Sequence, residues 1–162
     1  MTRKLRYRVA LSHRVPVDAS HDLPVRPVSV DDLDALARLM LDAYFGTIDY
    51  DGETLDEALE EVRAFLDSQS SLLDRSFVVV DHGRIVSGVL VSRVEGKPFI
   101  GYVMTVPSHK NQGLARMVTS VAMDCLAEDG YTEADLYITE GNIASEALFR
   151  SVGAVRFGDE SA

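Results

Sequence analysis

The chain is organised around residues 102–128, YVMTVPSHKNQGLARMVTSVAMDCLAE. They begin inside an apolar, β-branched run over residues 99–106 that is typical of a buried strand. Pro107 ends that strand, because proline has no N–H to give to a sheet. Apolar residues then recur at helical spacing, namely Leu114, Met117, Val118, Val121, Ala122, Cys125 and Leu126. The stretch therefore predicts a strand, a short loop and an amphipathic helix.

The loop between this strand and helix, residues 109–113, delivers backbone N–H groups to a helix start. Such a start attracts anions, and phosphates above all. Gly113 has no Cβ, so a phosphate can approach the backbone, and Lys110 and Arg116 add positive charge. Leu114 follows Gly113 and no G-x-G-x-x-G occurs, so neither of the common nucleotide loops is present. The loop is a candidate pyrophosphate site, and an ordinary strand–turn–helix connection is the alternative.

Composition narrows the class of protein. A length of 162 residues and an ordinary composition predict one globular domain. No apolar run is long enough to cross a membrane, and the basic N-terminus lacks the continuous apolar segment of a secretion signal. Cys125 is the only cysteine, so no internal disulfide is possible and a cytoplasmic location is the default expectation. Its place on the apolar stripe predicts that Cys125 is a core residue.

Charge and histidine spacing exclude several partners. The net charge of −10 argues against a nucleic acid, because phosphate contacts need a basic face. The charge is compatible with a cationic substrate, although acidity alone mostly provides solubility. The histidines at positions 13, 21, 82 and 109 show no metal-binding spacing. We therefore expect no nucleic acid, no membrane and no metal among the partners.

The N-terminus is interpreted separately from the rest of the chain. Apolar and mostly basic residues alternate over residues 4–11, which predicts a strand with one basic face. Residues 1–22 are interpreted as an N-terminal arm or extra strand, and residues 23–162 as a single domain. The arm is expected to pair with a sheet edge or with a second subunit in a homodimer; a loosely ordered leader is the alternative.

The remaining elements are predicted from caps, periodicity and turns. Helices begin after Ser29 and Thr54, each followed by acids that favour a helix N-terminus. Strands over residues 77–81 and 84–94 flank His82-Gly83 and predict a hairpin. Further predicted elements are a strand at 25–28, a strand at 134–139, a helix at 142–151 and a strand at 154–157. This order predicts an α/β fold with a mixed, mostly antiparallel sheet of six to seven strands and helices on both faces.

Two motifs resemble those of the GNAT superfamily of N-acetyltransferases. The spacing Lys110-x-x-Gly113-x-Ala115 is similar to the family's Arg/Gln-x-x-Gly-x-Gly/Ala loop, with lysine in place of the first residue. Residues 136–154, LYITEGNIASEALFRSVGA, resemble the family pattern L-x-V-x-x-x-N-x-x-A-x-x-L-Y-x-x-x-G-F. The resemblance extends over residues 23–157 and implies the GNAT, or acyl-CoA N-acyltransferase-like, fold.

The resemblance implies a site for acetyl-CoA. The strand that ends at residues 104–106 would diverge from the next strand, and its exposed backbone groups would pair with the pantetheine amides. The amides of residues 111–115 would hold the pyrophosphate, and Arg116 would reach the outer phosphate. Asn142 would bond the pantetheine arm, cap its helix, or do both. The implied cofactor-binding residues are Met104, Thr105, Val106, Lys110, Asn111, Gln112, Gly113, Leu114, Ala115, Arg116, Asn142, Ser145 and Phe149.

Two departures from the family pattern bear on catalysis. Phe149 stands where the family often has a tyrosine credited with protonating the departing thiolate, and phenylalanine has no proton to give. A thiol with a pKa near about 8.5 leaves fairly readily, so Ser145, Tyr137 or water are candidate donors. The central strand has no carboxylate to deprotonate an ammonium group with a pKa near about 10. The candidate routes for that proton are Asp49, Asp51 and a water molecule held by Tyr102.

An acidic run follows the first predicted helix. Residues 49–61 contain seven carboxylates and no basic residue. Such a run is usually a solvated helix face. In the family that this chain resembles, however, the loop between the first two helices commonly borders the acceptor site. The resemblance therefore favours a cationic amine as the acceptor.

These observations lead to one functional hypothesis and two rivals. The hypothesis is an acetyl-CoA-dependent N-acetyltransferase that transfers the acetyl group directly to a primary amine of a small molecule or peptide. Direct attack needs no nucleophile on the protein, which agrees with the lack of a nucleophile motif. A noncatalytic acyl-CoA-binding module is the first rival, and an interaction domain that retains only the scaffold is the second.

Overall fold

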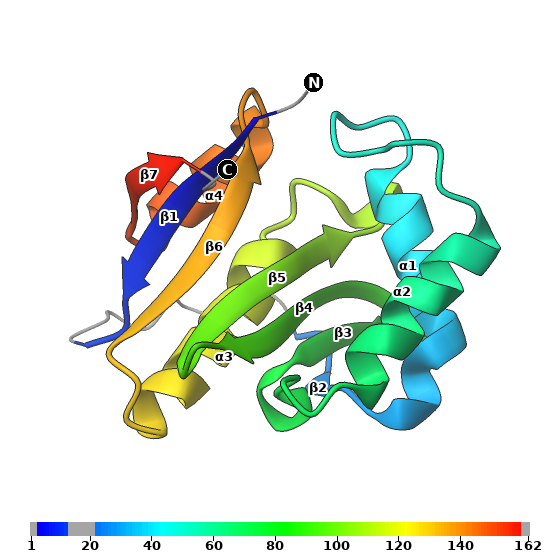
Figure 1. The fold of residues 1–162 in the computed structure, drawn as a ribbon. Coiled ribbons are helices and arrows are strands. Elements are labelled where there is room, and N and C mark those ends of the chain that lie inside the picture. Colours follow the sequence, from blue (N-terminus) through cyan, green and yellow to red (C-terminus); the bar gives the residue numbers. More distant parts are fainter. Residues whose placement is uncertain (1–2, 13–21, 160–162) are drawn as a thin grey trace.

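The computed structural model describes residues 3–12 and 22–159, so residues 1–2 and 13–21 of the predicted N-terminal arm lie outside these ranges. The described chain forms a seven-stranded sheet with helices on both faces (Figure 1). The strands are β1 (Lys4–Ala10), β2 (Val25–Pro27), β3 (Phe77–Asp81), β4 (Arg84–Val94), β5 (Lys97–Thr105), β6 (Glu133–Thr139) and β7 (Ala154–Asp159). The α-helices are α1 (Leu33–Tyr44), α2 (Leu55–Asp67), α3 (Leu114–Glu128) and α4 (Ile143–Ser151). Short 3-10 turns are η1 (Val30–Asp32), η2 (Leu73–Arg75) and η3 (Pro107–His109).

The sheet has the order β2-β3-β4-β5-β6-β1-β7. Every neighbouring pair is antiparallel except β5 and β6, which run parallel and are joined by α3. A parallel pair needs such a crossover connection, whereas the antiparallel pair β3 and β4 needs only a tight turn. The predicted α/β fold with a mixed, mostly antiparallel sheet is confirmed.

Strand β1 lies inside the sheet, between β6 and β7, rather than at an edge. Its apolar residues Leu5, Tyr7 and Val9 are buried. Its basic residues are on the other face, where Arg8 contacts Asp135 at 2.8 Å. The alternating pattern predicted the strand and its two faces, but not its neighbours. The division of the chain at residue 22 stays a prediction.

The helices form two layers around the sheet. In Figure 1, α1 and α2 cover the half of the sheet that contains β3 and β4, whereas α3 and α4 lie on the opposite face. Both predicted caps are present as capping boxes, with Ser29 preceding η1 and α1, and Thr54 preceding α2. The stripe of α3 packs into the core, although Val121 and Cys125 are only partly buried. No helix in the described ranges is long and apolar enough to cross a membrane.

Strand β5 differs from the expectation of a buried strand. Ile100 and Met104 are buried, but Phe99, Tyr102 and Val103 are only partly so. These three residues line a cavity on the side of β5 that no neighbouring element fills completely. The apolar run therefore predicted the strand correctly but did not distinguish packing against a core from lining a cavity.

Candidate functional site

Strands β5 and β6 diverge soon after they meet. Their pairing is limited to Phe99 with Asp135 and Ile100 with Leu136. Beyond these pairs, β5 continues to Thr105 and β6 to Thr139 while the two strands separate (Figure 1). The divergence implied by the family resemblance is thus present, and it leaves one edge of β5 without a strand partner in the described chain.

Backbone alternation shows which residues face this opening. The N–H of Val106 donates to Val86 O at 2.9 Å, and Met104 O accepts from the Ser87 hydroxyl at 2.9 Å. The backbone groups of Met104 and Val106 therefore turn toward β4. Neighbouring residues of a strand turn their N–H and C=O groups to opposite sides. Val103 and Thr105 therefore face the opening toward β6. Of the three residues expected to pair with pantetheine, Thr105 has the suitable direction.

The loop after β5 brings backbone N–H groups to the start of α3. Gly113 is the N-cap of α3, with φ of 80°, and provides no side-chain cap for the first turn. Asn111 also has a positive φ, of 63°. A side chain at a helix start would occupy the N–H groups there, and its lack leaves them to an outside anion. The local geometry suits a pyrophosphate group.

The basic residues of this loop have different surroundings. Arg116 is exposed on the first turn of α3. The ammonium of Lys110 instead donates to Ala43 O, near the end of α1, at 3.4 Å. A cation beside the last carbonyls of a helix is favourable, so Lys110 joins this loop to α1. Arg116 is accordingly better placed than Lys110 to meet a phosphate in the solvent.

A hydrogen-bonded chain holds the same loop to the β3–β4 turn. The imidazole of His109 contacts Asp81 at 2.8 Å through Nε2 and Ser108 at 2.8 Å through Nδ1. His82 also contacts the Asp81 carboxylate, at 2.7 Å. Hydrogen bonds from His109 and then His82 lower the pKa of Asp81 below its usual value. These contacts position the loop, and sequence analysis did not anticipate them because the turn lies far from the loop along the chain.

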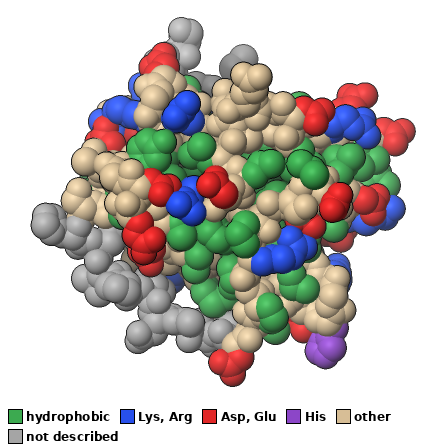
Figure 2. All heavy atoms as spheres, turned by 90° about the horizontal axis from the view of Figure 1, so that it is seen from below, with side chains coloured by type: hydrophobic (Ala, Val, Ile, Leu, Met, Phe, Trp, Pro, Cys, Tyr) green, Lys and Arg blue, Asp and Glu red, His purple; other side chains and the backbone are tan. Residues whose placement is uncertain are grey.

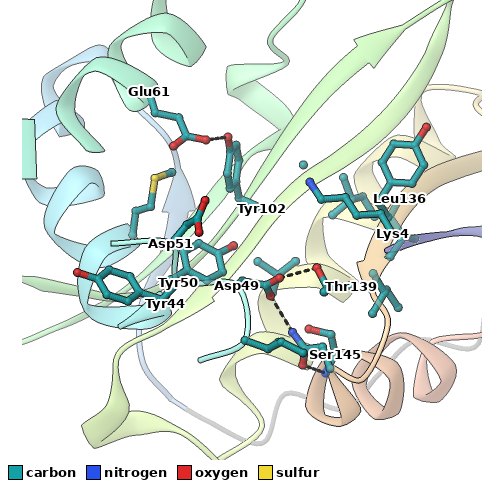
Figure 3. A pocket seen from close by; sticks show the side chains of 18 of the residues that line it. Lys4, Tyr44, Asp49, Tyr50, Asp51, Glu61, Tyr102, Leu136, Thr139 and Ser145 are labelled. Carbon is teal, nitrogen blue, oxygen red and sulfur yellow. Dashed lines mark hydrogen bonds between the residues drawn. The ribbon is translucent and has the colours of Figure 1, made fainter. Parts of the chain in front are cut away.

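A cavity of about 740 Å³ opens beside the diverging strands (Figure 3). Its walls come from α1 and α2, the loop between them, β4, β5, β6, α4 and the start of β1. All five residues predicted as catalytic candidates line it: Tyr102, Asp49, Asp51, Ser145 and Tyr137. Three cofactor candidates line it as well, namely Asn142, Ser145 and Phe149. The other cofactor candidates lie outside this lining, at the end of β5, in the loop that follows it and at the start of α3.

Asp49 fastens the α1–α2 loop to β6 and α4. Its carboxylate accepts hydrogen bonds from the Thr139 hydroxyl at 2.5 Å and from the Asn142 amide at 2.8 Å (Figure 3). The side-chain oxygen of Asn142 accepts from the N–H of Ser145 at 3.1 Å. Asn142 is therefore the predicted helix cap, and its amide is engaged by Asp49. Both oxygens of Asp49 are occupied, which favours a structural role for this carboxylate.

Glu61 and Tyr102 form a second polar pair in the cavity. The Tyr102 hydroxyl donates a hydrogen bond to the Glu61 carboxylate (Figure 3). Burial, followed by the bond to Glu61, raises the pKa of Tyr102 well above its usual value. Burial likewise raises the pKa of Tyr44 in the adjacent wall. Both phenols therefore remain protonated at neutral pH, and Glu61 is the carboxylate that faces the cavity from α2.

Glu61 and Lys4 line the cavity but were not predicted as site residues. Glu61 belonged to the acidic run but was not distinguished from the solvated face of α2. Its spacing from the buried residues Ala58 and Phe65, three residues after one and four before the other, places it at the border of the buried stripe. Lys4 reaches the cavity because β1 is paired with β6, opposite Thr139. No local pattern around Lys4 indicates that pairing.

The other candidates occupy distinct parts of the cavity. Tyr137 packs edge-on against Phe99, with ring centroids 5.5 Å apart, and is partly exposed. Phe149 is only 5% exposed, so the position of the usual family tyrosine is buried. Asp51 lies on the exposed α1–α2 loop, where its N–H donates to Glu53 at 2.9 Å. Ser145 lies at the start of α4, next to Asn142.

Comparison with known proteins identifies the family. The family described as "Acetyltransferase (GNAT) domain" matches residues 22–155. Because this match covers most of the chain, the chain belongs to the GNAT acetyltransferase family. No curated protein sequence matches it. Within the described residues, no cluster of three histidine, cysteine or acidic side chains is suited to hold a metal ion.

Solved structures share this fold at low sequence identity. A GCN5-related N-acetyltransferase from Sphaerobacter thermophilus has a TM-score of 0.78 at 16% identity, and the match covers 98% of this chain and 49% of that one. The Paia N-acetyltransferase from Thermoplasma acidophilum, in complex with coenzyme A, has a TM-score of 0.64 at 14% identity, and the match covers 81% of this chain and 88% of that one. The ribosomal-protein-S18-alanine N-acetyltransferase from Escherichia coli has a TM-score of 0.64 at 18% identity, and the match covers 80% of this chain and 76% of that one. The chain thus spans about half the length of the Sphaerobacter protein.

Proposed function

We propose that this chain is an acetyl-CoA-dependent N-acetyltransferase that acts directly on a primary amine of a small molecule or peptide. The observation that carries the proposal is the divergence of β5 and β6 beside a cavity, with an uncapped helix start at the loop that follows β5. This arrangement offers an extended backbone edge to a pantetheine arm and N–H groups to a pyrophosphate. The cavity then receives the acetyl group and the amine.

The cofactor would bind along β5 and α3. Val103 and Thr105 would pair with the pantetheine amides through the N–H and C=O groups that face β6. The N–H groups of residues 111–115 would hold the pyrophosphate, and Arg116 would approach the outer phosphate. Asn142, Ser145 and Phe149 would contact the end of the pantetheine arm from α4. Acetyl-CoA is thus the acetyl-donating substrate, and no step of the proposal requires a metal.

Glu61 is the base that the geometry favours for the acceptor. An ammonium group in the cavity would transfer a proton to the Glu61 carboxylate, which Tyr102 holds by its hydrogen bond. The neutral amine would attack the thioester carbonyl, forming the C–N bond, and the C–S bond would then break. The acylated nitrogen would lose its second proton, which water or the Ser145 hydroxyl would relay to the departing thiolate. Asp49 is less suited to this role because Thr139 and Asn142 occupy its oxygens.

A cationic acceptor agrees with the charge of the cavity. Four carboxylates line it, those of Asp49, Asp51, Glu53 and Glu61. The remaining acids of the run, at positions 56, 57 and 60, lie outside the lining, as expected for a solvated helix face. Negative potential in a cleft concentrates cations and raises their rate of encounter. A cytoplasmic location and a homodimer stay predictions from the sequence.

A noncatalytic acyl-CoA-binding module is the second candidate, and the observation that favours it is Phe149 at the family's tyrosine position. Two measurements separate the candidates. Calorimetry should detect acetyl-CoA binding for both. Thiol release from acetyl-CoA in the presence of a panel of amines should occur only for the enzyme. Acetyl-CoA binding without amine-dependent thiol release would favour the module. Absence of both the binding and the thiol release would reject the enzyme and the module alike.

A further inference from the structure

Lys4 is the one basic residue among those that line the cavity, and four of the other lining residues are acids. It lies at the start of β1, opposite Thr139 in the register with β6, and its side chain points into the cavity toward Tyr102 (Figure 3). It is separated along the chain from every other residue of the cavity wall. Only the insertion of β1 beside β6 brings its ammonium to this position.

The basic residues that follow Lys4 on the same face of β1 have partners. Arg8 contacts Asp135 at 2.8 Å and Glu133 at 3.5 Å. Arg6 lies over the ring of Phe157, 4.6 Å from its centroid. Among residues 3–12 and 22–159, by contrast, no carboxylate forms an ion pair with Lys4. The ammonium is thus available to a ligand.

Among the described residues, none of the acids that line the cavity forms an ion pair with Lys4. Asp49 approaches the same strand position, because Thr139 donates to it, but its oxygens are held by Thr139 and Asn142. Glu61 is held by Tyr102. Figure 3 shows Glu61 and Asp51 on the α1–α2 side of the cavity and Lys4 on the side of β6. The cavity therefore presents opposite charges from two walls.

The phosphates of the cofactor are poor candidates for the partner of Lys4. Their expected position is the start of α3, and residues 110–116 do not line the cavity that Lys4 enters. An anionic group near Lys4 therefore has to belong to the acceptor. Carboxylate is the anion that amines of amino acids and peptides carry within a few bonds.

We propose that Lys4 forms a subsite for a carboxylate of the acceptor, opposite the acids that receive its cationic groups. This inference rests on the proposed acetyltransferase function and specifies its substrate class. The acceptor would be a basic amino acid, or a peptide that presents an amine and a carboxylate together, rather than a polyamine. Ammonium–carboxylate hydrogen bonds are among the stronger polar contacts.

The test compares three acceptors with one carbon skeleton. Lysine carries the carboxylate, lysinamide replaces it by a neutral amide, and cadaverine lacks it. With the full chain and acetyl-CoA, kcat/KM for lysine should exceed that for lysinamide by roughly ten-fold, the size expected for one charged hydrogen bond. In Lys4→Gln this ratio should fall to near one, and cadaverine should improve because a like charge is removed.

Two further variants control for charge and structure. Lys4→Arg keeps the cation and should retain most of the preference for lysine. Lys97→Gln removes a lysine of β5 that lies outside the cavity lining and pairs with Glu133 at 2.5 Å, and it should keep the wild-type ratio. Equal kcat/KM for lysine and lysinamide, or a preference that survives in Lys4→Gln, overturns the subsite. Acetylation of Lys4 itself, detected by mass spectrometry, overturns it as well.

A second readout keeps the subsite separate from the enzymatic proposal. If none of the three amines is acetylated, the proposed function is the part that fails for these acceptors. Calorimetric titration of lysine and lysinamide into the protein loaded with coenzyme A then decides the subsite. Tighter binding of lysine that is lost in Lys4→Gln supports it, and equal or undetectable binding of the two ligands rejects it.

Discussion

Two carboxylates of the cavity illustrate how partners determine a residue's role. Asp49 accepts hydrogen bonds on both oxygens and fastens the α1–α2 loop to Thr139 and Asn142. Glu61 accepts one hydrogen bond, from Tyr102, and faces the cavity from a helix. A proton acceptor needs an oxygen within reach of the ammonium group. Glu61 meets that condition more readily than Asp49.

Glu61→Gln should lower kcat by at least roughly 10²-fold at neutral pH, because general base catalysis is commonly worth this much. The deficit should shrink as pH rises toward about 10, where the amine loses its proton without help. Thiol release measured as a function of pH gives both values. Glu60→Gln is the matched control, since Glu60 precedes Glu61 on the same helix but does not line the cavity. A deficit that is constant across pH would indicate a structural role for Glu61.

Phe149→Tyr tests whether a phenol is needed to protonate the thiolate. Phe149 is buried, and the departing thiol needs little acid assistance because its pKa is near about 8.5. Turnover should therefore change by less than about ten-fold, a small part of what acid catalysis can contribute. A gain in turnover of roughly several hundred-fold, comparable to what acid catalysis typically contributes, would show that the natural protein is catalytically impaired. That result would favour the acyl-CoA-binding module.

The start of α3 and the loop before it are the proposed phosphate site, and Gly113 allows a test of it. Gly113→Glu should abolish acetyl-CoA binding, because it places a carboxylate against the pyrophosphate. Gly113 has a φ of 80°, so any side chain there costs on the order of 1 kcal/mol through the backbone alone. Gly113→Ala carries the same strain without the charge and is the matched control. Calorimetry with both folded variants should show a much larger loss of affinity for glutamate than for alanine.

The start of α1 provides a prediction about pH and stability. Arg26 donates to the Asp32 carboxylate at 2.8 and 2.9 Å, and the Ser29 N–H donates at 2.8 Å. The bond to Arg26, more than any other cause, lowers the pKa of Asp32. A carboxylate with a lowered native pKa stabilises the fold above its unfolded pKa, near about 4. That contribution is lost as pH falls through the native pKa.

Asp32→Asn should therefore lower the free energy of unfolding at neutral pH by about 1–3 kcal/mol, the range for hydrogen bonds to charged groups. The difference from the natural protein should narrow once pH falls well below about 4. Urea unfolding at several pH values measures both. Asp31→Asn is the control, since Asp31 is the exposed acid of the same turn. A difference that persists unchanged in acid would mean that the carboxylate charge is not the cause.

The helices and strands were easier to predict from the sequence than the way in which they pair and pack against one another. The caps Ser29 and Thr54 and the turn at His82-Gly83 act within a few residues, so the pattern there defines helix starts and a hairpin. The position of β1 depends on contacts with strands more than a hundred residues away in the chain. Lys4 was missed for that reason. The pairing of Glu61 with Tyr102 likewise depends on how α2 packs on β5, which no local pattern specifies.

At the scale of the whole molecule, charge is distributed unevenly. On the face drawn in Figure 2, acidic and basic side chains are intermixed around apolar areas. The cavity instead gathers four carboxylates against one lysine. The net charge of −10 adds to this local potential over longer distances. The molecule should therefore attract cations in general and retain those that fit the cavity.

Varying the ionic strength distinguishes the long-range attraction of cations from their fit in the cavity, when the acceptors compared have the same length. Cadaverine, with two amines, should have a higher kcat/KM than pentylamine, with one. The advantage should shrink as salt shortens the Debye length from about 30 Å at 0.01 M to about 3 Å at 1 M.

Asp51→Asn should raise KM for cadaverine more than it lowers kcat, as expected for lost uniform binding. A collapse of kcat with unchanged KM would instead identify Asp51 as the base. If neither constant moves and anionic amines serve equally well, the acidic run is only a solvated surface.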